Sequence, residues 1–504
     1  MYILKIITVE RFRTKIGRQT TVAQQSCYGA RKNLKSQRSG SAACIFGGGC
    51  AAPKARWVRA NSRIGHRGVL LIALCYTIVM KFYADIEIHS KYARAVSPQM
   101  TLENLALWAQ KKGLRVISTG DFTHPDWFSD ISKKLEPAEP GLYQLKKDYC
   151  DTGQPFDQRQ TRFILGSEIS CIYTKNNRGR RVHHLVYASD IKAAEQINTK
   201  LSWVGNLRSD GRPIIGIDSK ELLKIVLDSS PMSALIPAHV WTPWFGVFGS
   251  KSGFDSLKEC FDELEPQIFA VETGLSSDPP MNWRIQFLDH KTIVSGSDSH
   301  SLPRIGREAT IFNTDLSYQG IMNAIKSRDE CFLGTVEFFP EEGRYHYDGH
   351  AACQVCFSPE QTKASNNKCP KCGKPLVIGV MARIIELADP QRPEGFKPDW
   401  ARPFMRMISL DEVIGEALSV GKNSKAVWRE YEEAVSRVAP ELPLLLDIPE
   451  NQLRSQLNGP TAEAIMRVRQ GKVSLKPGYD GEYGVIKIFE DGEAKKFVSQ
   501  KTLF

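Results

Sequence analysis

The strongest constraint on the fold is a regular alternation of short apolar runs with helical segments between Met80 and about Thr335. Seven runs have the length and composition of buried strands, and two intervening segments have the period of amphipathic helices. We expect strands at 82–88, 114–119, 163–169, 184–188, 234–238, 268–271 and 292–295, and helices at 102–111 and 220–227, the first capped by Thr101. Such alternation favours a parallel sheet, and about seven units in roughly 250 residues fit a barrel.

Acidic residues and histidines gather at the ends of these expected strands, and six of the ten histidines lie there. The carboxyl ends of barrel strands meet at one rim, where active sites are built. Imidazole and carboxylate together suit zinc, manganese or iron, with magnesium a further candidate, and so many groups exceed the needs of one ion. We predict two or three divalent ions, with Glu168 and Asp298 in catalytic roles. The predicted ligands are Glu87, His89, Asp121, His124, Glu168, His184, His239, Asp298 and His300.

A single histidine at a strand end is more often structural than a ligand, so neither His183 nor His124 would be assigned to metal by itself. The prediction rests on the joint pattern. The role of Asp85 is also undecided, because its side chain could cap its strand or could hydrogen-bond to a ligand and orient it.

Four cysteines form two Cys-x2-Cys pairs that are twelve residues apart. Thiolates at this spacing are typical of a closed, tetrahedral zinc site, so we predict one structural zinc bound by Cys353, Cys356, Cys369 and Cys372. His346 and His350 are close enough in sequence to substitute, but four thiolates already complete the shell. The other cysteines are not spaced as a disulfide framework, which indicates a reducing compartment, and we expect a cytoplasmic protein.

The net charge of +11 is confined to the start of the chain, where residues 1–79 hold 14 basic residues against the single acid Glu10. The rest carries 53 basic and 55 acidic residues, so its charge does not indicate a partner. We set 1–79 apart as an early start codon, a disordered nucleic-acid tail or a targeting segment. Its apolar run at 69–80 is shorter than the ~20 residues that span a bilayer. A composition of 42% hydrophobic and 24% charged residues excludes disordered, collagenous and membrane-bundle proteins.

Local clusters of basic and aromatic residues have two interpretations each. The basic residues could contact DNA phosphates or could simply be solvated; they are Lys175, Arg178, Arg180 and Arg181 before His183, and Lys368 and Lys371 between the cysteines. The aromatic residues after His239 could stack on an extruded base or belong to the core; they are Trp241, Trp244, Phe245 and Phe248.

Beyond the cysteines the pattern becomes helical. Ser409-x2-Glu412 has the form of a capping box that begins one helix, and two further helices are expected at 423–437 and 460–470. The last stretch, from Gly471, has a hairpin-like β pattern.

Six motifs in this order resemble those of the PHP (polymerase and histidinol phosphatase) superfamily: DIEIHS, TGDFTHP, GSEIS, HHLVYA, PAHVW and GSDSH. The resemblance implies a distorted (β/α)7 barrel with a trinuclear metal centre that hydrolyses phosphoesters. Glu87 stands where the first histidine of an HxH motif is usual, and TGDFTH stands where many members have TDH. The roles of Glu87, Asp121 and His124 therefore stay open.

Longer stretches resemble the endonuclease Q family: VETGLSSDPPMNWR, GSDSHSLPRIGREATIF and PGYDGEYGVIKIF. The resemblance runs from about Met80 to the end. It implies a PHP domain at 80–340, a four-cysteine zinc module at 341–380, and a mainly helical domain at 381–504 that ends in a β-hairpin-like segment.

For function, the resemblance implies a metal-dependent DNA repair endonuclease. It would cut on the 5′ side of deaminated bases (hypoxanthine, uracil, xanthine) or at abasic sites, with damaged DNA as its partner. A phosphatase of small phosphomonoesters and a non-catalytic, zinc-containing DNA-binding scaffold remain alternatives. We expect a monomer that does not bind membranes, and a sliding-clamp partner stays open.

Overall fold

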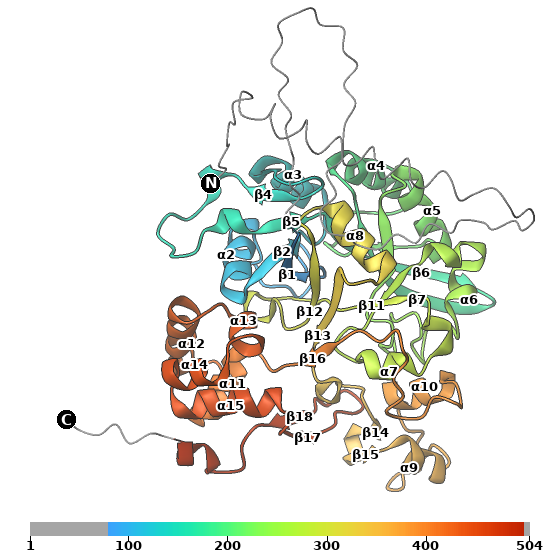
Figure 1. Cartoon of the computed structure of the whole chain (residues 1–504). Coiled ribbons are helices and arrows are strands. Elements are labelled where there is room, and N and C mark those ends of the chain that lie inside the picture. The colour runs from blue at the N-terminus through green and yellow to red at the C-terminus, as the bar shows by residue number, and fades with distance from the viewer. Residues whose placement is uncertain (1–78, 498–504) are drawn as a thin grey trace, which may run out of the picture. The chain divides into compact units, whose positions relative to one another are not determined.

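The computed structural model describes residues 79–497, which belong to one compact unit. Of the basic extension predicted at 1–79, residues 1–78 lie outside the described residues. The described chain is a mixed α/β fold followed by a mainly helical part (Figure 1).

An eight-stranded sheet holds the first predicted strand, β1, near its centre. In sheet order its strands are β16 (Phe404–Arg406), β13 (Phe332–Glu337), β12 (Ala309–Asp315), β1 (Val79–Asp85), β2 (Leu114–Ser118), β5 (Arg162–Ile164), β4 (Tyr143–Leu145) and β3 (Leu135–Pro137). β1 is parallel to β2 but antiparallel to β12. The sheet is therefore mixed, and the expectation of a parallel sheet was wrong for this part of the chain.

Further strands form a four-stranded sheet and a parallel pair. The sheet order is β8 (Ile214–Ile215), β6 (Gly166–Lys175), β7 (Arg178–Tyr187) and β9 (Ala234–Pro237), and the pair is β10 (Ala270–Glu272) with β11 (Thr292–Val294). β6 and β7 form a long hairpin whose two turn residues, Asn176 and Asn177, have φ of 55° and 57°, as a two-residue hairpin turn requires. All seven predicted strands overlap observed strands. Their hydrogen bonds divide among separate sheets, so the single closed barrel stays a prediction.

Helices pack on the strands that precede or follow them: α2 on β2, α5 on β9, and α8 on β11, β12 and β13. The helices before residue 340 are α2 (Leu102–Lys112), α3 (Pro125–Lys134), α4 (Ile191–Ser202), α5 (Ser219–Ser229), α6 (Leu257–Phe261), α7 (Pro279–Trp283) and α8 (Tyr318–Ser327). The Thr101 side chain accepts a hydrogen bond from the amide of Asn104, which confirms the predicted cap of α2.

The cysteine-rich segment contains a short hairpin and one helix, and six helices and a second hairpin follow it. These elements are β14 (Asp348–His350), β15 (Val355–Phe357), α9 (Pro359–Ala364), α10 (Val380–Leu387), α11 (Leu410–Leu418), α12 (Lys425–Arg437), α13 (Glu441–Leu446), α14 (Glu450–Gln456), α15 (Gly459–Arg469), β17 (Ser474–Lys476) and β18 (Val485–Lys487). β16 adds to the large sheet and α12 and α13 contact α2, so these parts pack on the first α/β region.

The capping box predicted at Ser409 does not form, although α11 begins there. The Ser409 side chain makes no cap bond and instead lies 3.4 Å from Nη1 of Arg304. The Glu412 carboxylate is held by Arg304 and Lys422, at 2.8 and 2.7 Å, so it cannot turn back to the helix start.

The residues that connect β17 to β18, 477–484, lie closely against residues 341–351. The amides of Gly478 and Gly484 donate to the carbonyl oxygens of Glu341 and Glu342. A Cβ atom at Gly484 would lie 2.1 Å from the Glu341 carbonyl oxygen, so this approach requires glycine.

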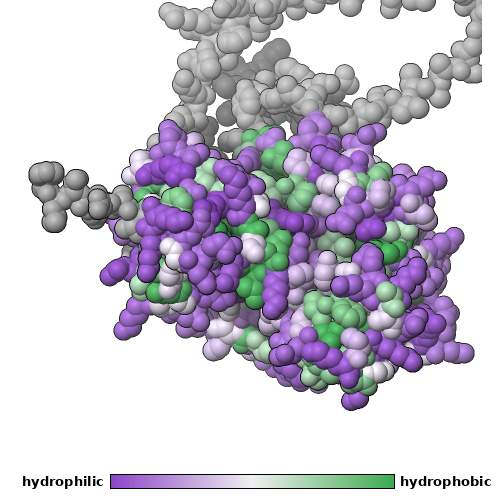
Figure 2. All heavy atoms as spheres, turned by 90° about the horizontal axis from the view of Figure 1, so that it is seen from below, coloured by the Kyte–Doolittle hydropathy of each residue, from purple (hydrophilic) through white to green (hydrophobic). Residues whose placement is uncertain are grey.

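The face with this hairpin is seen from below in Figure 2, where hydrophilic residues predominate and apolar residues gather in separate patches. Within residues 79–497, no helix combines the length and the apolar character needed to cross a membrane.

Candidate metal centre

Seven histidine and acidic side chains, which lie in two strands or just after three others, converge on one place. Three overlapping groups, joined through Glu168 and Asp298, each bring their ligand atoms within 4.8 Å of one another. Their members are Glu87 and His89 after β1, Glu168 in β6, His183 in β7, His239 after β9, and Asp298 and His300 after β11.

The carboxylate of Glu168 lies at the middle of this cluster. Its Oε1 is 2.5 Å from Nδ1 of His183 and 3.0 Å from Nε2 of His239. Its Oε2 is 3.0 Å from Nε2 of His89 and 3.1 Å from Nη1 of Arg212. Burial alone would raise the pKa of Glu168, but the charges of His183 and Arg212 lower it well below its ordinary value. The side chain is therefore an anion, as a metal ligand must be.

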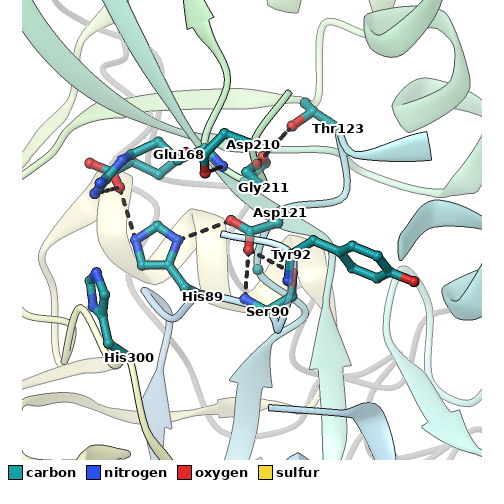
Figure 3. Close-up of polar contacts among 12 residues, drawn as sticks. His89, Ser90, Tyr92, Asp121, Thr123, Glu168, Asp210, Gly211 and His300 are labelled. Atoms are coloured by element: carbon teal, nitrogen blue, oxygen red, sulfur yellow. Dashed lines mark hydrogen bonds and ion pairs between the residues drawn. The ribbon is translucent and has the colours of Figure 1, made fainter. Parts of the chain in front are cut away.

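Asp121 holds His89 from behind, as Figure 3 shows. Its Oδ1 lies 3.0 Å from Nδ1 of His89, and its Oδ2 accepts hydrogen bonds from the amide and hydroxyl of Ser90 at 2.6 and 2.7 Å. Nε2 of His89 thereby faces Glu168 and Asp298. Burial lowers the pKa of His89, but the charge of Asp121 outweighs it and raises that pKa well above its ordinary value. Asp121 thus orients the ring of His89, and it is outside the three groups although it was predicted as a ligand.

Two predicted histidine ligands lie elsewhere. His124 stacks on the ring of Tyr92, with 4.4 Å between the ring centroids. His184 points to the other side of β7, where its Nε2 is 2.8 Å from the Ser219 hydroxyl. Because successive side chains of a strand alternate between faces, His183 enters the cluster and His184 cannot.

Crowded, buried acids make this cluster suited to cations. Both carboxylate oxygens of Glu87 and Oε1 of Glu272 are buried and accept no hydrogen bond, and Oδ1 of Asp298 has Nε2 of His89 beside it at 3.2 Å. Burial and the charge of Glu272 raise the pKa of Glu87 well above its ordinary value, and burial raises that of Glu272 to about 7. Divalent cations would satisfy these atoms and neutralise the repulsion, so the residues fit a mixed nitrogen and oxygen metal site. Glu272 was not predicted.

The backbone is strained at three residues of the site. Asp121, His239 and Asp298 have φ of 47°, 28° and 44°. Non-glycine residues rarely adopt such values, and the cost is accepted mainly at functional sites.

The exposed side of the cluster is formed by Asp298, His300 and Arg212, whose side chains are 25%, 32% and 25% exposed. Glu168 and His89 are almost fully buried. Among the described residues of the cluster, Asp298 and His300 are the most exposed, so their side is the open approach to the centre.

The predicted DNA-binding residues divide by their contacts. Lys175 is paired with Asp262 at 3.0 Å, and Arg180 is buried over the ring of Phe254. The others are exposed: Arg178, Arg181, Lys368 and Lys371.

The aromatic residues after His239 divide in the same way. Trp241 and Phe248 are buried in the core. Phe245 lies on His183 with 4.4 Å between ring centroids, and Trp244 is 38% exposed.

The cysteine-rich segment contains a second candidate metal site, which differs from the prediction at one position. Its four ligand atoms come from His350, Cys353, Cys369 and Cys372. Cys356 is not a member of this group.

Two solved structures of endonuclease Q proteins match the chain. The lesion-specific endonuclease PfuEndoQ from Pyrococcus furiosus has a TM-score of 0.71 and 30% identity, covering 82% of this chain and 96% of that protein. An endonuclease Q in complex with a 27-mer duplex that has an abasic lesion at the active site also has a TM-score of 0.71, with 29% identity, covering 84% of this chain and 100% of that one.

Two uncharacterized proteins are similar in sequence, and no family model matches the chain. YqxK of Bacillus subtilis is 28% identical over 419 residues, which are 81% of this chain and 99% of YqxK. MJ0043 of Methanocaldococcus jannaschii is 32% identical over 273 residues, which are 52% of this chain and 33% of MJ0043, so the chain spans only about a third of that relative. The match to PfuEndoQ, at 30% identity over almost all of that protein, carries the assignment: the chain belongs to the endonuclease Q family of nucleases.

Proposed function

We propose that the chain is a metal-dependent DNA endonuclease that hydrolyses the phosphodiester on the 5′ side of deaminated bases or at abasic sites. The observation that carries the proposal is the cluster of seven nitrogen and oxygen ligands with buried, unpartnered atoms, in a chain similar to a lesion-specific endonuclease. The proposal includes a PHP-type barrel at 80–340, a zinc module at 341–380 and a C-terminal domain at 381–504.

Each residue of the centre has a proposed task. Two or three divalent ions, when bound, would lower the pKa of water and neutralise the charge of a phosphate. Glu168 would help to hold the ions, because the imidazole nitrogens of His89, His183 and His239 lie 2.5 to 3.0 Å from its carboxylate oxygens. Asp298, on the exposed side, would bind metal and accept a proton. Arg212 would bind a phosphate oxygen from the same side.

The DNA would be held by exposed basic residues, with Arg178 and Arg181 on the β6–β7 hairpin and Lys368 and Lys371 in the zinc module. Lys175 and Arg180 would instead stabilise the hairpin, because their charged groups are engaged within the protein. Phe245 and Trp244 are placed to meet a base that leaves the stack.

The test uses end-labelled duplexes that contain uracil, hypoxanthine, an abasic site or no lesion, each incubated with Mg²⁺, Mn²⁺ or Zn²⁺. We expect a cut on the 5′ side of the lesion, no cut in the undamaged duplex, and no cut in chelator. Hydrolysis of a small phosphomonoester without cleavage of DNA would refute the proposal.

Asp298→Asn is the matched active-site variant. It should lower cleavage at least about a hundredfold while the affinity for lesion DNA stays close to that of the wild type. Asp491→Asn is the control, since the Asp491 side chain is 99% exposed and far along the chain from the centre. Full activity of the Asp298 variant would contradict the assigned role.

A further inference from the structure

Two turns of the cysteine-rich segment have the same hairpin register. Gly349 lies opposite Cys356 in the first, and Lys368 lies opposite Pro375 in the second, each pair being seven positions apart. When the two turns are aligned residue by residue, with Gly349 on Lys368, Cys356 falls on Pro375, which is not a candidate ligand.

In the same alignment of the two turns, the candidate ligands of the first turn fall on those of the second. His350 corresponds to Cys369, and Cys353 corresponds to Cys372. Both turns continue with a residue at positive φ, Gln354 at 51° and Gly373 at 73°. The chain therefore repeats one metal-binding turn, with a histidine in place of the first cysteine.

Strand alternation turns Cys356 away from this site. Val355 pairs with His350, and its side chain packs with Cys369 in a small core. Cys356, the next residue, points to the opposite face of the β14–β15 hairpin. A Cβ at Gly349, opposite Cys356, would meet the Tyr479 ring at 2.3 Å, so the C-terminal segment packs on Gly349 there, while Cys356 itself stays partly exposed.

The distances fit zinc. Nδ1 of His350 is 3.5 Å from Sγ of Cys372, and one atom from each of the four residues lies within 4.8 Å of the others. A tetrahedral zinc with a thiolate at about 2.3 Å and an imidazole nitrogen at about 2.0 Å puts these two ligand atoms about 3.5 Å apart. The first turn is also fixed from outside, because Asp480 accepts a hydrogen bond from the Ala351 amide at 2.6 Å.

We propose that the zinc of this module is held by His350, Cys353, Cys369 and Cys372, and that Cys356 is not a ligand. The inference rests on the structural zinc of the proposed function. Three thiolates and an imidazole leave the site one unit less negative than four thiolates would. This favours contact of the neighbouring Lys368 and Lys371 with a phosphate backbone.

The experiment exchanges zinc for cobalt(II) in the full-length protein and records the near-ultraviolet absorption of cobalt–thiolate bonds, which the imidazole and carboxylate centre does not produce. Cys356→Ser should leave the band unchanged. Cys353→Ser should lower it by about a third, and His350→Cys should raise it by about a third, as three thiolates become two or four.

A second readout keeps the test independent of folding defects. In the zinc-loaded wild type, N-ethylmaleimide followed by peptide mass spectrometry should modify Cys356 and spare Cys353, Cys369 and Cys372. A band lowered by about a quarter in Cys356→Ser, with Cys356 protected from alkylation, would overturn the ligand assignment alone. A wild type without any cobalt–thiolate band would refute the structural zinc as well, while cleavage of lesion DNA tests the proposed function separately.

Discussion

At the scale of single residues, the neighbours His183 and His184 illustrate how strand alternation assigns different tasks to identical side chains. His183 lies 2.5 Å from the Glu168 carboxylate, whereas His184 lies against Ser219 and the ring of Phe261. His183→Ala should lower cleavage at least about a hundredfold and weaken Mn²⁺ binding, with little change in stability. His184→Ala should cost about 1–3 kcal/mol of stability and leave the metal centre intact. Calorimetric titration measures the Mn²⁺ affinity of the two variants, and urea unfolding measures their stability. Equal losses of Mn²⁺ affinity in the two variants would contradict the assignment.

His346 is a buried histidine outside the metal centre whose protonation should affect stability. Burial lowers its pKa from 6.5 to about 4. Between these values the unfolded chain binds a proton that the folded chain does not, so stability falls as the pH falls. Lowering the pH from 7 to 5 should cost about 2 kcal/mol through this group. His346→Gln should remove that part of the pH dependence in urea unfolding at the two pH values. Parallel losses in the variant and the wild type would show that His346 does not titrate as described.

At the scale of secondary structure, a buried ion pair joins α2 to the C-terminal helices. Nζ of Lys112 is 2.5 Å from Oε2 of Glu441, and both side chains are at most 2% exposed. Glu441 also accepts hydrogen bonds from the Leu410 amide and the Tyr431 hydroxyl. Glu441→Gln would leave the ammonium group buried beside a neutral amide, which should destabilise the protein by about 3 kcal/mol.

The double variant Lys112→Met with Glu441→Gln should regain most of that loss, since neither side chain is then charged. Lys81→Met is the control, because the exposed Lys81–Asp447 pair also reaches the C-terminal helices but should contribute less than about 1 kcal/mol. Urea unfolding of the wild type, Lys112→Met, Glu441→Gln and the double variant gives the coupling energy of the buried pair, and additive effects of the two buried substitutions would contradict it.

The same scale shows how much the sequence can predict. The seven strands were found because their apolar runs are short and are bounded by turns. The predicted start of β7 is six residues late, because its polar start from Arg178 hides the strand, and the predicted ligand was His184, whereas the structure brings His183 into the cluster. The helices α13 and α14 were missed because Pro443, Pro440 and Pro449 interrupt the helical pattern. The choice between His350 and Cys356 depends on hairpin register, which identical spacings cannot reveal.

At the scale of the whole molecule, the metal centre joins elements from β1 to β11, so its occupancy should influence the stability of the entire fold. Without cations, the acids Glu87, Glu168, Glu272 and Asp298 repel one another in a buried place. Mn²⁺ at about a hundred times its dissociation constant should add about 2.7 kcal/mol to the free energy of unfolding. Manganese prefers oxygen and imidazole to thiolates, so this gain reports on the cluster and not on the cysteines.

His239→Ala should gain much less from Mn²⁺, because it removes an imidazole that lies 3.0 Å from the Glu168 carboxylate. His290→Ala is the matched control, since His290 is exposed and outside the three groups, and it should respond as the wild type does. The measurement is thermal unfolding of the three proteins over a Mn²⁺ series. The cluster exists only in the folded protein, so Mn²⁺ that binds there must raise the unfolding temperature. A wild type whose unfolding temperature does not change with Mn²⁺ would contradict the common metal centre.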